Sequence, residues 1–373
     1  MKKHRLYNWF INLSLLPGFL FILVFLYIRF GFKYNHDYHI SSGLQWAFYF
    51  FALIYIPKIT YILFYHFNKV HDKVRNTHTH SLRRTGFVIA IFMVGVMGYG
   101  NMVTRDDLEL VRQQIDVKEL PTEFDGYKIA VIADFHIGNW NNRYRIMHSL
   151  IDSINSEYPD MIIFAGDMVN NFADELEGWE PYFKELKSKQ GNFAVLGNHD
   201  YGDYTQWKSD SAKSENLERI KQGIRNLGFR LLLNENENIV MGKDTISLVG
   251  VENWSNRHFH CYGDLRKALI NTPPSRKKIL ITHDPAHWDA EVVGKNDIFL
   301  SISGHTHAGQ MGVINKHIRF SPSMFVFKQW QGLYKKREQY LYVNRGIGYV
   351  GIPMRIGVRP EITILELKRT SAP

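Results

Sequence analysis

Groups of carboxylate, imidazole and amide side chains follow five short apolar runs in the C-terminal two-thirds of the sequence. These groups are Asp134-Phe-His136, Gly166-Asp-Met-Val-Asn170, Gly197-Asn-His-Asp200, His283-Asp284 and Gly304-His-Thr-His-Ala-Gly-Gln310. Imidazole and carboxylate ligands together suit Zn, Fe or Mn, whereas Mg and Ca prefer oxygen ligands alone. Two imidazoles as close in sequence as His305 and His307 would repel if both were protonated, and a metal ion holds them neutral. The pattern therefore predicts a metal centre.

The runs that precede these groups are rich in β-branched residues and are typical of buried strands. They cover residues 129–133, 161–164, 193–196, 278–282 and 298–301, and helical patterns cover residues 143–155 and 215–227. Alternating strands and helices favour an α/β domain with buried sheets. Such folds commonly place catalytic groups in loops beyond the carboxyl ends of their strands. The five groups follow strands in this way.

Each group by itself has a simpler explanation. Gly-Asp and Gly-Asn are common in turns, and a buried histidine is usually a hydrogen-bonded core residue. All five groups occur in one order, however, and each follows an apolar run. That combination favours a metal centre over coincidence.

The order of the groups resembles the calcineurin-like metallophosphoesterase superfamily, from about residue 108 to the C-terminus. The stretches Ala308-Gly-Gln310, Tyr342–Gly348 and Arg359-Pro-Glu361 are similar to its membrane-attached bacterial branch. The resemblance implies an α/β fold of four layers, in which two mixed β-sheets are flanked by helices. An N-terminal transmembrane region of about three helices, residues 1–104, would precede this metallophosphoesterase domain, residues 105–373.

The resemblance also implies a ligand set for two divalent metal ions, with Mn, Fe or Zn expected. One ion would be held by Asp134, His136, Asp167 and His307, and the second by Asp167, Asn198, His283 and His305. Asp167 would bridge the two ions. No required position is missing, so the sequence gives no sign of an inactive copy.

Two further residues receive catalytic roles from the resemblance. His199 would stand beside the substrate, and Asp200 would orient its ring. Two cations about 3.5–4 Å apart neutralise a phosphate and lower the pKa of a bridging water, and the resulting hydroxide attacks phosphorus. His199 would stabilise the transition state or protonate the departing oxygen, which typically contributes about 10²–10⁴-fold.

The N-terminal third of the chain is its most apolar and most basic part. Residues 1–119 hold 14 Lys/Arg against 7 Asp/Glu, whereas the remainder holds 31 against 29, for a net charge of +9 overall. Apolar stretches at 9–28, 44–67 and 86–103 approach the roughly 20 residues that cross a bilayer. The first is too long for a signal peptide and lacks a following Ala-x-Ala-like cleavage site. The second is the least regular, because it contains Pro57 and Lys58.

Flanking charges predict the topology of these spans. Basic residues precede the first stretch and fill the loop between the second and third, which the positive-inside rule places in the cytoplasm. The C-terminal domain would then lie outside the cytoplasm, attached to the inner or cell membrane of a bacterium. His71, His78 and His80 in the second loop lack a neighbouring carboxylate cluster, so a solvated loop is the simpler interpretation.

These observations favour a membrane-anchored phosphohydrolase with two metal ions, which cleaves phosphoester or diphosphate bonds by a metal-bridged hydroxide. Three spans exceed what a tether needs, which suggests a lipid-linked substrate. One alternative is the UDP-2,3-diacylglucosamine diphosphatase of lipid A assembly, known in the resembling branch, but its substrate is made in the cytoplasm. Another is a non-catalytic, metal-binding membrane sensor. Nucleic acid is disfavoured as a partner because residues 120–373, which make up nearly all of the catalytic domain, carry only +2. The oligomeric state stays open.

Several residues keep two interpretations. Arg345 lies in a Gly-flanked turn and would contact a phosphate or the solvent. Asn141, Arg143 and Arg145 would contact the substrate or belong to a helix start. Residues 254–261 are expected to form a polar loop near the mouth of the cleft. Cys261, the single cysteine, has no partner for a disulfide and is read as inert.

Overall fold

The computed structural model describes residues 16–27, 37–140, 144–255, 260–315 and 317–370. The chain divides into two compact units. One comprises residues up to Thr104 together with Gly351–Ile356, and the other comprises Arg105–Val350 and the residues from Gly357 onward. No pattern in the sequence predicts that six residues from late in the chain belong with the N-terminal unit.

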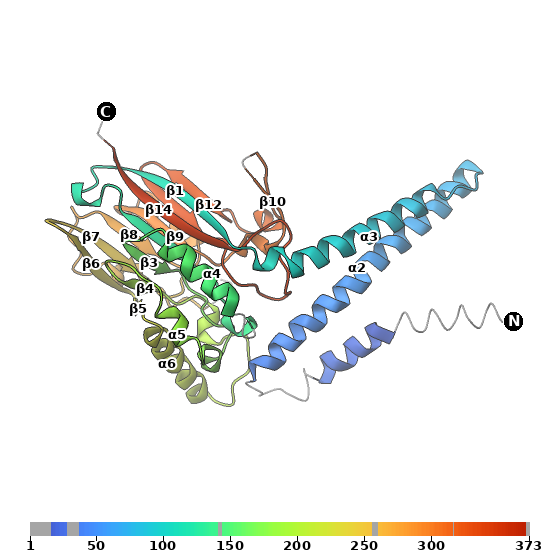
Figure 1. Ribbon diagram of the computed structural model, residues 1–373, viewed down its shortest axis with the longest axis horizontal. Coiled ribbons are helices and arrows are strands. Elements are labelled where there is room, and N and C mark those ends of the chain that lie inside the picture. Colours follow the sequence, from blue (N-terminus) through green and yellow to red (C-terminus); the bar gives the residue numbers. More distant parts are fainter. Residues whose placement is uncertain (1–15, 28–36, 141–143, 256–259, 316, 371–373) are drawn as a thin grey trace. The chain divides into compact units, whose positions relative to one another are not determined.

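Two long helices dominate the N-terminal unit, α2 (Tyr38–Arg75) and α3 (Ser81–Met102) (Figure 1). Both are long and apolar enough to cross a membrane, and the second candidate span extends from Ser81 to Asp106. Helix α2 continues through Pro57. A shorter apolar helix, Leu16–Tyr27, covers the described part of the first predicted span. The rest of that prediction lies outside the described residues.

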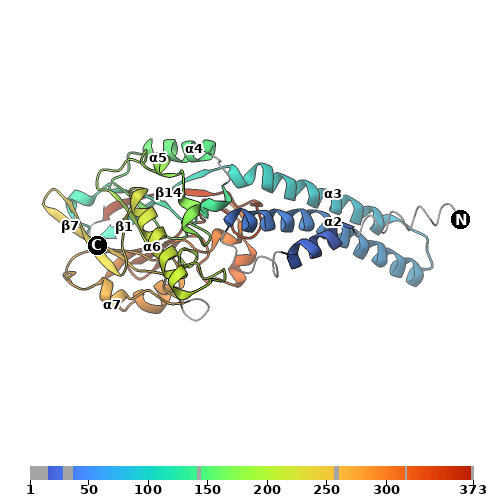
Figure 2. The same cartoon turned by 90° about the horizontal axis from the view of Figure 1, so that it is seen from below.

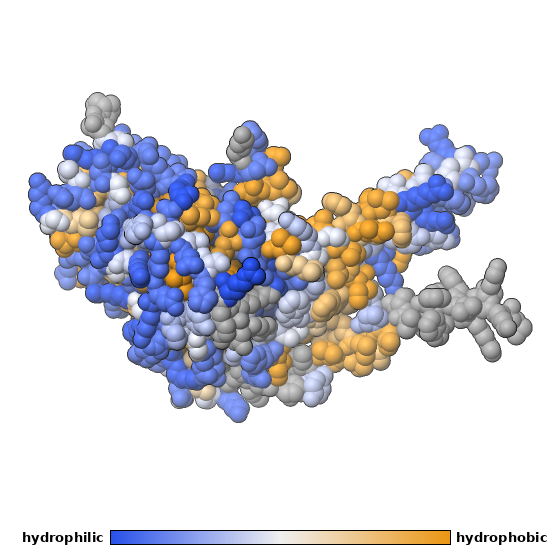
Figure 3. Space-filling model, in the orientation of Figure 1, coloured by the Kyte–Doolittle hydropathy of each residue, from blue (hydrophilic) through white to orange (hydrophobic). Residues whose placement is uncertain are grey.

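Apolar side chains cover much of the surface of these helices (Figure 3). Phe67 and Phe92 are among those that are more than half exposed, which suits helices that face lipid. The two helices approach closely at Gly86, where a Cβ would overlap Phe64. The segment Gly351–Ile356 is joined to the end of α3 by a hydrogen bond from the Arg355 amide to the Gly100 carbonyl, 3.1 Å long.

The second unit contains two six-stranded sheets (Figure 1). The first has the order β1-β14-β2-β3-β4-β5 and the second has the order β12-β13-β9-β8-β7-β6. In the first sheet the strands are β1 (Glu109–Lys118), β2 (Lys128–Ile132), β3 (Met161–Phe164), β4 (Asn192–Ala194), β5 (Arg230–Leu231) and β14 (Glu361–Thr370). In the second they are β6 (Glu235–Met241), β7 (Asp244–Gly250), β8 (Lys278–Ile281), β9 (Ile298–Ser303), β12 (Gly332–Lys336) and β13 (Gln339–Val343).

Both sheets are mixed. Strands β2, β3, β4 and β5 are parallel to one another, while β14 is antiparallel to β2. In the second sheet β7, β8, β9 and β13 are parallel, and β6 and β12 are antiparallel edge strands. A separate hairpin is formed by β10 (Val313–Ile314) and β11 (Arg319–Phe320).

Three apolar cores separate four layers. The alternation of side chains along β2 sends Ala130 and Ile132 to one face of the first sheet and Ile129 and Val131 to the other. The first face is covered by α4 (Tyr144–Asn155), α5 (Glu180–Phe183) and α6 (Asp210–Asn226), and the second packs on the other sheet. The far face of the second sheet packs on α7 (Leu265–Ala268) and the π-helix Trp288–Val292. Figure 2 shows α4 and α5 on one side of the strands and α7 on the other.

The predicted fold is therefore confirmed: two mixed sheets lie between layers of helices. The five predicted strands correspond to β2, β3, β4, β8 and β9, and the two helical patterns correspond to α4 and α6. The other described strands, β1, β5–β7 and β10–β14, were not predicted from the sequence.

Candidate metal centre

The five sequence groups meet where the two sheets present the carboxyl ends of their parallel strands. Asp134, Asp167 and Asn198 follow β2, β3 and β4 of the first sheet. The predicted histidine ligands His283, His305 and His307 follow β8 and β9 of the second sheet, while His136 follows β2. Within each sheet these strands are parallel neighbours. The fold thus brings all seven predicted metal ligands together.

Many of these ligands have an unusual backbone conformation. Asp134, His136, Asp167, His305 and His307 all have positive φ, between 46° and 76°. Side chains other than glycine rarely adopt this conformation, and it costs roughly 1–3 kcal/mol at each position. The surrounding structure holds the strained loops, so that several side chains from separate strands aim at one point.

Glycines allow the loops to approach the carboxylates closely. A Cβ at Gly197 would overlap Oδ1 of Asp167, and a Cβ at Gly304 would lie 2.5 Å from Oδ2 of Asp134. The glycines that precede Asn198 and His305 are therefore required by packing against the ligand carboxylates.

One group of donors is formed by Asp134, His136 and His307. The Nε2 atoms of His136 and His307 are 3.1 Å apart, and Nε2 of His307 lies 3.6 Å from Oδ1 of Asp134. Asp167 lies beside this group, with its Oδ2 3.8 Å from Nε2 of His136. All four side chains are buried.

A second group of donors surrounds Nε2 of His283. This atom lies 3.1 Å from Oδ2 of Asp167, 3.1 Å from Oδ1 of Asn198 and 3.2 Å from Nδ1 of His305. The other ring nitrogen, Nδ1, lies 2.8 Å from the Ala165 carbonyl, which can only accept, so Nδ1 carries a hydrogen. Nε2 of the neutral ring therefore presents a lone pair among three further donor atoms.

These distances fit bound divalent ions. Ligand atoms about 2.1 Å from a metal lie about 3.0 Å apart in octahedral geometry and about 3.4 Å apart in tetrahedral geometry. The spacings of 3.1–3.2 Å around His283 fall in this range. Oδ2 of Asp167 lies 3.8 Å from Nε2 of His136 in the first group and 3.1 Å from Nε2 of His283 in the second, so one carboxylate is near both groups, as a bridging ligand must be. The residues present therefore fit two divalent metal ions.

The charges of the site also favour a cation. Burial would lower the pKa of His283, but the carboxylates of Asp167 and Asp134 outweigh it and raise that pKa to about 10. Burial and the charge of His283 lower the pKa of His305 to about 4. The two buried carboxylates therefore stabilise a positive charge beside them, which the proton on His283 provides. A bound metal ion would provide that charge in place of the proton.

The candidate catalytic residue His199 lies beside both groups. Its amide donates to Oδ1 of Asp167 over 2.9 Å, and its Nδ1 lies 2.9 Å from the Asn170 carbonyl. Nδ1 therefore carries the hydrogen, and Nε2 is left for chemistry. The ring stacks on Tyr204, with centroids 4.1 Å apart and planes 17° apart. One nitrogen of His199 also lies within 4.8 Å of the donor atoms of His136 and Asp167.

The expected role of Asp200 is corrected by the structure. Its carboxylate accepts hydrogen bonds of 2.9–3.1 Å from four backbone amides, those of Gly197 and residues 167–169. The His199 ring is held instead by the Asn170 carbonyl. Asp200 is buried beneath the two loops that carry Asp167 and Asn198, and it fixes their backbones rather than the imidazole. Burial and the charge of Asp167 raise the pKa of Asp200 to about 7.

Sequence reasoning missed two residues that support the site. Glu175 is buried and accepts hydrogen bonds from the amides of Gly138, Asn170, Asn171 and Phe172, and thereby fixes the loop whose carbonyl holds His199. Tyr204 accepts a 2.6 Å hydrogen bond from Nδ2 of Asn198. Neither belongs to a ligand motif, and only the folded chain brings them to the site.

Neither sequence interpretation of Arg345 is correct. Its side chain is buried and forms ion pairs with Glu361 and, at 2.9 Å, with Glu109. Cys261 is exposed as a free thiol. Arg145 lies on α4, whereas Asn141, Arg143 and residues 256–259 lie outside the described residues.

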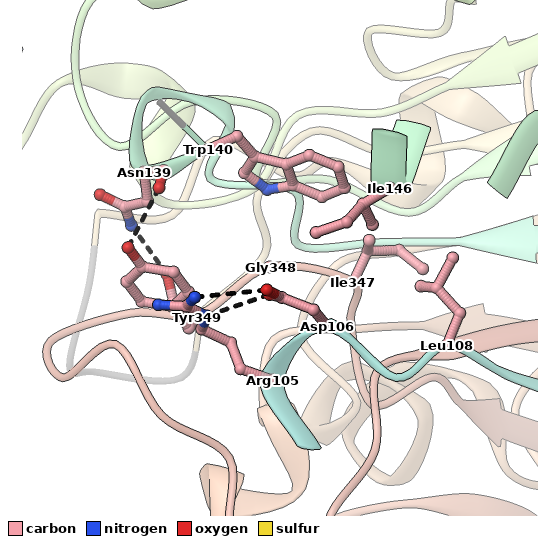
Figure 4. Close-up of a pocket in the computed structure, with 9 residues that line it drawn as sticks. All are labelled: Arg105, Asp106, Leu108, Asn139, Trp140, Ile146, Ile347, Gly348 and Tyr349. Atoms are coloured by element: carbon pink, nitrogen blue, oxygen red, sulfur yellow. Dashed lines mark hydrogen bonds and ion pairs between the residues drawn. The ribbon is translucent and has the colours of Figure 1, made fainter. Parts of the chain in front are cut away.

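Two hollows lie near the loops of the centre. Figure 4 shows a small cavity lined by Arg105, Trp140 and Tyr349, among others. Its volume of about 10 Å³ has room for one water at most. A larger cleft of about 430 Å³ includes His305 in its wall, together with Asp284, Phe327, Lys328 and Gln329. Of these two hollows, the larger one reaches a candidate metal ligand and has room for a substrate.

Comparison with known proteins agrees with this geometry. The sequence profile of the family described as calcineurin-like phosphoesterase matches residues 127–309. The chain carries a calcineurin-like metallophosphoesterase domain. This family generally binds two divalent metal ions.

Relatives with this domain occur in animals and bacteria. A "transmembrane protein with metallophosphoesterase domain" of Bos taurus is 31% identical over 80% of this chain and 64% of its own length. The protein of the same name from Danio rerio is 29% identical over 78% of this chain and 64% of its own length. The chain thus matches less than two thirds of either protein. An uncharacterized metallophosphoesterase of Campylobacter jejuni is 26% identical over 99% of this chain and 92% of its own length.

Proposed function

We propose that this chain is a membrane-anchored phosphohydrolase that uses two divalent metal ions to cleave a phosphoester or diphosphate bond in a lipid-linked substrate. The observation that carries the proposal is the position of Asp167, whose Oδ2 lies near both donor groups, 3.8 Å from Nε2 of His136 and 3.1 Å from Nε2 of His283. The two helices of membrane-spanning length and the relatives named as transmembrane proteins support the anchoring and the lipid-linked substrate.

Different residues of the chain would bind the metal ions and transfer the proton. When bound, the two ions would neutralise the phosphate and lower the pKa of a water that attacks it. Asp167, Asn198 and His283 would hold and space the ions. His199 has its hydrogen-bearing Nδ1 on the Asn170 carbonyl, so Nε2 is the nitrogen left to face the substrate, and in the imidazolium form of the ring it would donate its proton to the leaving oxygen.

A hydrolysis assay tests this function. The purified full chain would be stripped of metal by chelation, and hydrolysis of bis-p-nitrophenyl phosphate and of a lipid-linked diphosphate in vesicles would be followed as Mn²⁺ is returned. We expect no hydrolysis without metal and restored hydrolysis with it. A chain that binds two ions and hydrolyses neither substrate would instead favour the non-catalytic sensor.

We also propose that the metallophosphoesterase domain lies outside the cytoplasm. The proposal rests on the basic residues before the first apolar stretch and on those at the adjoining ends of α2 and α3, which are Lys69, Lys73, Arg75, Arg83 and Arg84. A compartment-sensitive reporter fused after Pro373 tests it. An active cytoplasmic reporter would contradict this orientation and would favour a nucleotide-linked lipid such as UDP-2,3-diacylglucosamine as the substrate.

A further inference from the structure

Exposed apolar side chains are concentrated in one segment of the second unit. Among its described residues, eleven large apolar side chains are exposed, and seven of them lie between Met311 and Val326. Phe325 and Val326 are 78% and 75% exposed. The segment comprises the hairpin β10–β11 and the 3₁₀ turn Pro322–Phe325. Figure 3 shows apolar residues at the surface around this hairpin. Concentrations of this kind on soluble proteins mark interaction surfaces.

This segment is firmly joined to the metal centre. It begins four residues after the ligand His307, and Oγ of Ser321 donates to the Ala308 carbonyl over 2.7 Å. Gly312 packs so closely on Gly357 that a Cβ on the latter would overlap the Gly312 carbonyl. The end of the segment, Val326, lines the same 430 Å³ cleft as His305. The apolar surface is therefore continuous with the cleft.

The charge of this region suits an anionic surface. Residues 298–337 contain six Lys/Arg and no Asp or Glu. Lys328 and Lys336 form ion pairs with Asp289, and Lys335 with Glu338, while Lys316 and Arg319 lie within the apolar segment itself. Apolar side chains flanked by basic residues are typical of segments that lie in the headgroup region of a bilayer, where anionic lipids attract the basic groups.

Only short stretches of chain connect the second unit to the unit of the membrane helices. Only two residues separate the candidate span Ser81–Asp106 from β1. At the root of the segment, Oε1 of Gln310 accepts a 2.6 Å hydrogen bond from the amide of Val350. Val350 and Gly357 flank the six residues that belong to the unit of the membrane helices.

We propose that residues 311–326 form a membrane-interface surface, which inserts its apolar side chains among the lipids and admits the phosphate of a lipid-linked substrate to the cleft beside His305. The bilayer is its occupant, favoured over a second protein by the basic flanks and by the short connections to the membrane helices. The admission of substrate rests on the proposed function, whereas the membrane contact does not.

Fluorescence quenching tests the contact in the full chain. In a Cys261→Ser background, Phe325→Cys would be labelled with an environment-sensitive dye in nanodiscs that hold one chain each, with or without lipids that carry a quencher near the headgroup. The matched control is Ile270→Cys, a position that is 59% exposed in another part of the same unit. We expect quenching at least severalfold stronger at position 325. Equal quenching at both positions would overturn the proposal. A second preparation with several chains per disc tests for a protein partner: if the dye at position 325 leaves water only in that preparation, the proposal is also overturned.

Kinetics separate this proposal from the proposed function. Phe320→Ser combined with Phe325→Ser should lower hydrolysis of a lipid-linked diphosphate in vesicles by about tenfold or more, because less apolar surface enters the lipid. Hydrolysis of bis-p-nitrophenyl phosphate should be unchanged, and Ile270→Ser should alter neither rate. Equal loss on both substrates, or loss on neither, would contradict the admission of substrate at this surface. Failure of the unaltered chain to hydrolyse either substrate would refute the proposed function, while the quenching result would still decide the membrane contact.

Discussion

Tyr204 is expected to fix the orientation of the candidate ligand Asn198. Nδ2 of Asn198 donates to the Tyr204 hydroxyl over 2.6 Å, and its Oδ1 thereby faces His283 at 3.1 Å. Without this bond the amide can turn and present its NH₂ group, which does not bind metal. The change Tyr204→Phe removes the hydroxyl and leaves the ring stacked on His199. The perturbation therefore removes this hydrogen bond and keeps the aromatic ring.

The size of the effect follows from that bond. A hydrogen bond contributes about 0.5–1.5 kcal/mol net, which corresponds to about 2- to 12-fold in affinity. We expect Tyr204→Phe to weaken binding of one of the two ions by this factor. The lost activity should return when Mn²⁺ is raised by the same factor, because the rate with both ions bound depends on groups that this variant retains.

Metal titration by calorimetry and rates at increasing Mn²⁺ would measure the two effects. Tyr158→Phe is the control, since Tyr158 is 77% exposed and lines a different hollow, together with Asn155 and Lys189. Tyr204→Ala also removes the stacking on His199, so it should lose rate that excess metal does not restore. Unchanged affinity in Tyr204→Phe, or a loss that Mn²⁺ fails to repair, would refute the role assigned to the hydroxyl.

Three further changes probe other parts of the site. His199→Ala should keep both metal ions and lose about 10²–10⁴-fold in turnover; metal content and rate measure this, and full activity would exclude the role. In Gly197→Ala the added Cβ overlaps Oδ1 of Asp167, so metal content should fall while circular dichroism stays unchanged; a full metal content would contradict the packing. Arg345→Met leaves Glu361 buried without its ion pair, and should lower the free energy of unfolding by about 3–5 kcal/mol. An unchanged denaturation midpoint would show that the pair is not needed.

The ligand groups could be predicted from sequence because their chemistry is local. Each group follows an apolar run, and parallel strands carry their following loops to the same edge. That reasoning placed Asp134, Asp167 and His283 at one site, although nearly 150 residues separate the first from the last. The two mixed sheets and their flanking helices were predicted from the resemblance to the calcineurin-like metallophosphoesterase superfamily.

The supporting residues could not be predicted because tertiary packing alone selects their partners. Glu175 binds backbone amides, which every residue except proline offers, so no residue type marks its role. Arg345 pairs with Glu109, which is 236 positions away. Asp200 was given the wrong partner because its motif shows that it is near His199 but not which way its carboxylate turns.

The central claim is that Asp167 bridges two metal ions that are needed for hydrolysis. The most direct test is to measure bound metal per chain and hydrolysis of bis-p-nitrophenyl phosphate together, in the unaltered full chain and in Asp167→Asn. We predict two divalent ions per chain with metal-dependent hydrolysis in the first, and loss of both bound metal and hydrolysis in the second. Hydrolysis that survives chelation, or an Asp167→Asn variant that keeps two ions and full activity, would contradict the claim.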